Sequence, residues 1–105
     1  MKSPTLEKAD ACINGERQDQ YGNPEYSFAL IAAYWTDYLD NDAVTIEAHD
    51  VAIMMALFKI ARMSGQKWAP DNVVDACGYL AILNDRLKPV PQPGTNAPKE
   101  GANGE

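Results

Sequence analysis

Apolar residues recur at intervals of three and four along most of this 105-residue chain, which is the spacing of one face of an α-helix. The pattern predicts four helices, and no stretch alternates as a half-buried β-strand would. Short polar connections separate the four segments, which favours an all-α fold and a compact four-helix bundle. The expected helices span residues 5–20, 24–39, 46–64 and 71–86.

Residues with capping or stop preferences delimit these helices. Ser3 or Thr5 begins the first helix and Asn23 precedes the second, and each has a side-chain oxygen that can accept from a free N–H of the first turn. We expect Thr45 to cap the third helix and Gly65 to follow its last turn. Local sequence signals therefore mark the starts of the first three predicted helices and the end of the third.

The third predicted helix contains DVAIMMALFKIARM, residues 50–63, which is apolar nearly all round. Such a helix is buried on more than one side, so we expect it at the centre of the bundle or in an oligomer seam. A domain of this size buries only roughly 60–65% of its unfolded surface and is marginally stable alone. We therefore expect the chain to self-associate as a homo-oligomer.

The last part of the chain, KPVPQPGTNAPKEGANGE, is rich in Pro, Gly and Asn, and its only large apolar side chain is Val90. Such a segment buries too little surface to offset its ordering entropy, so we expect it to be disordered. The chain then divides into a helical domain, residues 1–87, and a tail, residues 88–105.

Charge and composition narrow the classes of function. The formal net charge is −6, and an acidic chain has no general attraction to nucleic acid or to anionic membranes. No run of 18 apolar residues is present, and MKSPTLEKAD at the N-terminus has no hydrophobic segment. We therefore expect no membrane span, no signal peptide, no direct nucleic-acid binding and a cytoplasmic location.

Cysteine and histidine usage limits the metal chemistry. Cys12 and Cys77 lie in different predicted helices without a CxxC partner, so they are expected to be core residues in a reducing compartment. His49 is the single histidine, which excludes a site with two histidine ligands. The carboxylates are the candidate metal ligands that remain to be considered.

Four acids at the starts of the third and fourth predicted helices are candidate ligands for such a metal. Glu47 and Asp50 are spaced i, i+3, and Asp71 and Asp75 are spaced i, i+4, so each pair shares a helix face. Mg²⁺ accepts one or two carboxylates and keeps several waters, which suits either pair. The alternative is that these acids only complement the positive end of the helix dipole, and the spacing leaves both interpretations open.

Two cations and two tyrosines complete a candidate ligand site. Lys59 and Arg62 lie one turn apart and can hold a phosphate chain. Arg62 also suits the negative end of a helix dipole, whereas Lys59, deep in an apolar helix, is expected to be functional or ion-paired. Tyr21 can stack on a base or cover the end of the bundle, and Tyr79 flanks Asp75. Acids for Mg²⁺, cations for phosphates and an aromatic ring for a base are the parts of a nucleoside phosphate site.

Three strings carry a resemblance to known families: QYGNP at residues 20–24, DVA at 50–52 followed by Lys59 and Arg62, and DNVVD at 71–75 followed by Gly-Tyr. Over about residues 8–84 the chain resembles a family of small uncharacterised phage and prophage proteins. It is similar to the phage nucleotide-modification-associated domains. More distantly, it resembles the MazG-type all-α nucleoside triphosphate pyrophosphohydrolases. Those enzymes are oligomeric helical bundles that use Mg²⁺ to cut a nucleoside triphosphate to monophosphate and pyrophosphate.

The MazG-type resemblance implies roles for the candidate residues. A carboxylate, Asp75 or Asp50, would act as base towards a metal-activated water, and Tyr21 and Tyr79 would contact the substrate. The implied metal ligands are Glu47, Asp50, Asp71 and Asp75, and the implied phosphate ligands are Lys59 and Arg62.

The chain also departs from that pattern, because it has no EExxE motif, and Asp71 and Asp75 are spaced i, i+4 where the enzymes have i, i+3. Three hypotheses follow. The chain is a Mg²⁺-dependent nucleotide pyrophosphohydrolase, a non-catalytic protein that binds or sequesters a nucleotide, or a small acidic helical protein that binds a host or phage protein. If the chain is phage-encoded, it would act in the host cytoplasm.

Overall fold

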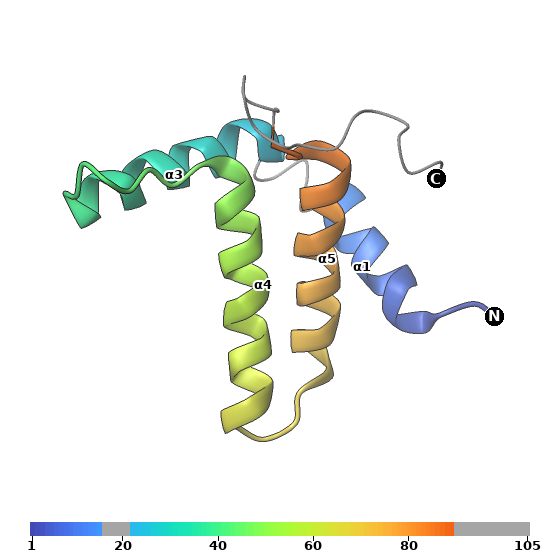
Figure 1. Ribbon diagram of the computed structural model, residues 1–105. Helices are drawn as coiled ribbons and strands as arrows, with labels where there is room; N and C mark the ends of the chain where they lie inside the picture. Colours follow the sequence, from blue (N-terminus) through green and yellow to red (C-terminus); the bar gives the residue numbers. More distant parts are fainter. Residues whose placement is uncertain (16–21, 90–105) are drawn as a thin grey trace, which may run out of the picture.

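The structure, a computed structural model, describes residues 1–15 and 22–89. Within these ranges the chain forms four helices and no strand, which confirms the all-α prediction (Figure 1). None of these helices is long and apolar enough to cross a bilayer. The four helices are α1 (Pro4–Asn14), α3 (Pro24–Leu39), α4 (Ala48–Gly65) and α5 (Pro70–Arg86). Most of the predicted tail, from residue 90 on, lies outside the described residues.

The arrangement is built around α5. Helices α4 and α5 lie side by side and antiparallel, joined by the short segment 66–69, while α1 packs against α5 away from α4 (Figure 1). Helix α3 crosses the N-terminal end of α4 at a steep angle and also contacts α5. The sequence favoured the apolar third helix, α4, for the centre or for an oligomer seam. Among the four described helices, α5 is the one with substantial contacts to all the others.

Two of the predicted N-caps are confirmed. Ser3 Oγ accepts a hydrogen bond from the Leu6 N–H at 3.2 Å, and Asn23 Oδ1 accepts from the Tyr26 N–H at 2.9 Å. Each bond satisfies a donor that the first turn of a helix leaves free. A proline follows each cap, where its missing N–H costs nothing.

The first helix ends earlier than predicted, at Asn14 instead of Gln20. Gly15 leaves the helical conformation with φ −103° and ψ −142°. A Cβ at Gly15 would lie 2.6 Å from the Ala11 carbonyl oxygen, so this bend requires a glycine. The predicted continuation over residues 16–20 falls outside the described residues.

The cap of α4 also differs from the prediction, because Glu47 takes the place expected for Thr45. The Glu47 N–H donates to Asp50 Oδ2 at 2.9 Å, and the two residues form a capping box. The E-x-x-D spacing that had suggested metal binding therefore has a local structural use at the start of α4.

Buried apolar positions in the described residues are mostly occupied by small side chains. Val51 is the one large side chain that is fully buried. The other buried apolar residues are Ala9, Ala32, Ala52, Ala56, Val74, Ala76 and Leu87. Because alanines bury little area, this core contributes a modest part of the free energy of folding.

Side-chain hydrogen bonds and an ion pair fix segments that lie outside this core. Thr36 Oγ1 accepts from the Ile46 N–H at 2.9 Å and donates to the Ile46 carbonyl at 3.2 Å, which ties the segment before α4 to α3. At the other end of α3, Arg86 donates two hydrogen bonds of 2.7 Å to the Glu25 carboxylate. The Arg86 hydrogen bonds are the main cause that lowers the pKa of Glu25 below its ordinary value of 4.5.

We predict that Thr36→Val lowers the free energy of unfolding by about 1–2 kcal/mol, because both backbone groups of Ile46 lose their partner in a half-buried place. Urea titration measures this change. Thr45→Val is the control: Thr45 is exposed in the same connection and should change stability little. Equal losses in the two variants would contradict the role given to Thr36.

The Arg86–Glu25 pair predicts a pH dependence of stability. Because the folded-state pKa of Glu25 is lowered, the pair's contribution is fully present above the unfolded value of 4.5 and is lost as pH falls through the lower folded pKa. Melting temperatures of the wild type and of Arg86→Gln should therefore differ most at neutral pH and converge in acid. Glu25→Gln, which cannot titrate, should also differ from the wild type in melting temperature at neutral pH and approach it in acid. A difference in melting temperature that stays constant with pH would exclude the ion pair as its source.

Candidate functional site

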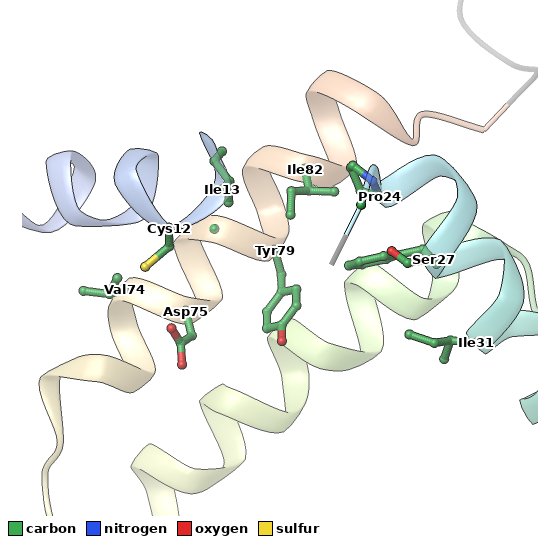
Figure 2. A pocket seen from close by; sticks show the side chains of 12 residues that line it. Cys12, Ile13, Pro24, Ser27, Ile31, Val74, Asp75, Tyr79 and Ile82 are labelled. Atoms are coloured by element: carbon green, nitrogen blue, oxygen red, sulfur yellow. The ribbon is translucent and has the colours of Figure 1, made fainter. Parts of the chain in front are cut away.

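A cavity of about 340 Å³ lies between α1, α3 and α5, and Figure 2 shows the side chains around it. This volume is within the range of small-ligand sites. Its walls are mainly apolar, with Ile13 from α1, Ile31 from α3 and Ile82 from α5. Asp75 contributes the one charged side chain among the described lining residues. The cavity therefore suits a ligand with an apolar body and one polar end.

Gly78 accounts for the close approach of α1 to α5 beside the cavity. It is buried, and a Cβ there would lie 3.3 Å from Ile13 Cγ2. That distance is tighter than usual, so a larger residue would push α1 outward. Glycine destabilises a helix by about 1 kcal/mol relative to alanine. At position 78 it lets α1 and α5 approach closely at the cavity wall.

Two aromatic rings line the cavity from different helices. Phe28 of α3 and Tyr79 of α5 have ring centroids 6.3 Å apart at an interplanar angle of 52°. No spacing signal in the sequence marked Phe28 for a site. Tyr79 was expected there because it flanks Asp75, and Figure 2 shows both side chains on the same side of α5. Flat rings pack well against such a pair.

Lys59 reaches this site from α4 through an ion pair. Its Nζ lies 3.0 Å from Asp75 Oδ2, and the two side chains are 16% and 23% exposed. Charges held this far from water interact more strongly than a surface pair, but each also loses hydration. The expectation that Lys59 is either functional or ion-paired is met by the pair with Asp75.

Arg62 lies one turn after Lys59 on α4, and both cations lie against the Phe58 ring. Arg62 is exposed, and its guanidinium carbon is 5.6 Å from the ring centroid, while Lys59 Nζ is 5.7 Å from it. The two cations predicted to hold one phosphate chain therefore share a flank of α4, and Lys59 is paired with Asp75. Tyr21, the other aromatic candidate, lies outside the described residues.

The four predicted metal ligands are not brought together in one chain. Asp75 is level with Lys59, so antiparallel packing places Asp50 about 14 Å from Asp75 along the helix axes, and about 20 Å from Asp71. In the described ranges, no three His, Cys, Asp or Glu side chains are grouped to hold a metal ion. A single centre made of Glu47, Asp50, Asp71 and Asp75 is therefore not formed within the chain.

The acids at the start of α4 have partners of another kind. Asp50 accepts from the Glu47 N–H, and the His49 imidazole Nε2 lies 3.4 Å from Asp50 Oδ1. The sequence suggested a metal as the partner of Asp50, or helix-dipole complementarity alone. At the start of α5, Asp71 is exposed in the first turn, where it complements the helix dipole.

We predict that Lys59→Met lowers the free energy of unfolding by about 1–3 kcal/mol, because it leaves the Asp75 carboxylate mostly buried and unpaired. Asp75→Asn relieves that charge, so the double variant should cost less than the sum of the two single changes. Lys2 and Glu7 form the control pair, 3.3 Å apart but 91% and 56% exposed, and their cycle should give a coupling near zero. Equal couplings in both cycles would contradict the importance of burial.

Comparison with known proteins gives the family. A profile described as "Domain of unknown function (DUF6378)" matches residues 4–87. The "Gene 55 protein" of Mycobacterium phage D29 is 37% identical over 83 residues, which are 79% of this chain and 53% of that protein. The "Gene 55 protein" of Mycobacterium phage L5 is 34% identical over 95 residues, 90% of this chain and 60% of that protein. No solved structure matches the chain significantly.

These matches confirm the resemblance to uncharacterised phage proteins, while the likeness to MazG-type enzymes and to nucleotide-modification-associated domains stays a prediction. The chain spans 53% and 60% of the length of the two relatives. Because the family profile covers nearly all of the described helices, this chain belongs to the DUF6378 family, with relatives among mycobacteriophage proteins.

Proposed function

We propose that the chain binds a nucleoside phosphate in the cavity between α1, α3 and α5. The observation that carries this proposal is one apolar cavity with two aromatic rings in its wall and the Lys59–Asp75 ion pair at its edge. The base would pack near Phe28 and Tyr79, and the phosphates would point towards Lys59. An apolar body with a charged end is the ligand shape that such a lining recognises.

The ion pair gives this site a way to respond to a phosphate. A phosphate beside Lys59 Nζ would compete with Asp75 for the ammonium, and charge-assisted hydrogen bonds to phosphate are strong. Asp75, once released, would accept a hydrogen bond from the sugar or contact a Mg²⁺ that arrives with the phosphates. Mg²⁺ needs only one or two protein carboxylates, so Asp75 is enough for that role. A longer phosphate chain would also reach Arg62, the second cation on this part of α4.

Binding without hydrolysis is the form of this proposal that the geometry favours. Hydrolysis of the MazG type would need a metal centre made by several carboxylates, and the candidate acids lie at different levels of α4 and α5. The absent EExxE motif points the same way. The chain would then sense or sequester a nucleotide in the host cytoplasm.

Calorimetric titration of the 105-residue chain with nucleoside mono-, di- and triphosphates, with and without Mg²⁺, tests this proposal. A ligand in 100-fold excess over its dissociation constant should stabilise the fold by about 2.7 kcal/mol in a parallel melting experiment. Lys59→Gln should weaken binding of the triphosphate about tenfold or more, because it removes the charge beside the phosphates. Ser27→Phe, which adds bulk to the cavity lining, should weaken every nucleotide.

Lys67→Gln is the matched control for charge, since Lys67 is an exposed lysine in the segment between α4 and α5. Its affinity should equal that of the wild type. An equal loss of affinity in Lys67→Gln and Lys59→Gln would show that net charge alone attracts the nucleotide, and it would reject the proposed site. If no nucleotide gives binding heat or a shift in melting temperature, nucleotide binding is rejected. If pyrophosphate is released from a triphosphate, the chain is an enzyme and not only a binding protein.

A further inference from the structure

The outward side of α4 carries five large apolar side chains, which we call the α4 outer face. Its residues are Ile53, Met54, Leu57, Phe58 and Ile60, and their exposed fractions lie between 39% and 57%. Ala52 and Ala56, which are buried, lie on the opposite side of the helix from Met54 and Phe58. Contiguous exposed apolar side chains of this extent mark an interaction surface.

No other part of this chain has the composition to cover the α4 outer face. Residues 16–21 and 90–105, which lie outside the described ranges, contain only Tyr21 and Val90 as large apolar residues. The described neighbours of α4 are α3 and α5, and they leave these five side chains exposed. Within the described residues nothing covers these five side chains, so the α4 outer face is open to a separate molecule.

The spacing of the face indicates that its occupant is a helix. Ile53, Leu57 and Ile60 are separated by four and three residues, which is the spacing of apolar positions in a helix–helix seam. Lys59, the one charged residue between positions 53 and 61, is paired with Asp75 of α5. Lys59 and Arg62 lie beside Phe58 at the edge of the face, so the stripe of Ile53, Leu57 and Ile60 itself contains no charged residue. A second α4 offers the same unbroken apolar stripe.

The charges at the two ends of the face identify a second copy as a suitable partner. Glu47 and Asp50 precede the face, and Arg62 and Lys67 follow it. If two α4 helices pair antiparallel with Leu57 at their centre, the acidic N-terminal end of each helix, with Glu47 and Asp50, lies beside the basic C-terminal end of the other, with Arg62 and, in the segment after α4, Lys67. A parallel pair would place acids beside acids, and it would also align the helix dipoles.

We infer that two copies of this chain associate through the α4 outer face, with the two α4 helices antiparallel about a twofold axis near Leu57. Such an interface is isologous, because each copy uses the same residues. It covers side chains that water would otherwise contact, and it adds apolar burial that the alanine-rich interior of one chain does not supply. This inference concerns a different surface from the cavity and does not depend on the proposed ligand.

Light scattering coupled to size exclusion, on the 105-residue chain without ligand, tests the association. The wild type should have twice the chain mass of 11.5 kDa. Leu57→Glu should be monomeric, because it places a charge at the centre of the interface. Leu6→Glu is the matched control: Leu6 on α1 is 60% exposed against 57% for Leu57, and this variant should remain a dimer.

Cysteine cross-linking tests the direction of the pair in a chain that remains folded. Leu57→Cys should form a disulfide between copies under mild oxidation, whereas Ser64→Cys should not, because antiparallel helices place the two Ser64 positions about 21 Å apart along the axis. The unmodified chain, with Cys12 and Cys77, gives the background. A monomeric wild type, or dissociation by Leu6→Glu as strong as by Leu57→Glu, would overturn the interface and assign the face to another protein. Cross-linking of Ser64→Cys as efficient as that of Leu57→Cys would overturn the antiparallel arrangement.

Discussion

Close approach of the helices through small side chains is the constraint on which the rest of this structure depends. Ala52 and Ala56 of α4, Ala76 and Gly78 of α5, and Ala9 of α1 occupy most of the buried positions. Small residues let helices pack closely, but they remove little apolar area from water. Most of the large apolar side chains are consequently at the edge of the cavity or on the surface. Polar links, above all Lys59–Asp75 and Arg86–Glu25, then help to fix how the helices sit.

The local part of the fold was predictable, because the signals that begin and end helices act over three or four residues. Ser3 and Asn23 show this, since the donors that they satisfy lie in the same turn. Two predicted boundaries were wrong for equally local reasons. Gly15 ends the first helix, which was predicted to continue to Gln20, and Glu47 caps α4 in place of Thr45. The Glu47–Asp50 spacing, which had suggested metal ligands or helix-dipole complementarity, is also the spacing of the capping box that forms there.

The site was only partly predictable, because spacing within a helix says which residues share a face and not which faces meet. Asp75 and Tyr79 were found as neighbours within α5, and Lys59 was expected to have a charged partner. The four candidate metal ligands lie apart within the chain for a topological reason that the sequence did contain. The connection 66–69 is short, so α4 and α5 must be antiparallel, and residues that begin both helices lie at opposite ends. Phe28 had no comparable signal, since its contact with Tyr79 depends on how α3 crosses the other helices.

Helix α4 separates the two surfaces for which functions are proposed. Lys59 and Leu57 are two residues apart, which on a helix is about 200° of rotation, so they lie on nearly opposite sides. Lys59 faces α5 and the cavity, whereas Leu57 faces away from both. A ligand at the cavity therefore touches no residue of the α4 outer face. The Lys59–Asp75 pair is a direct polar link between the cavity wall and α4, so it gives ligand binding a route to self-association, as a shift of α4 against α5. Helix α3, which lines the cavity and also packs on α4, is a second route. Small side chains bring α4 and α5 into the most extensive contact among the described helices, so a phosphate that releases Asp75 from Lys59 removes a polar link while the packing between the two helices remains.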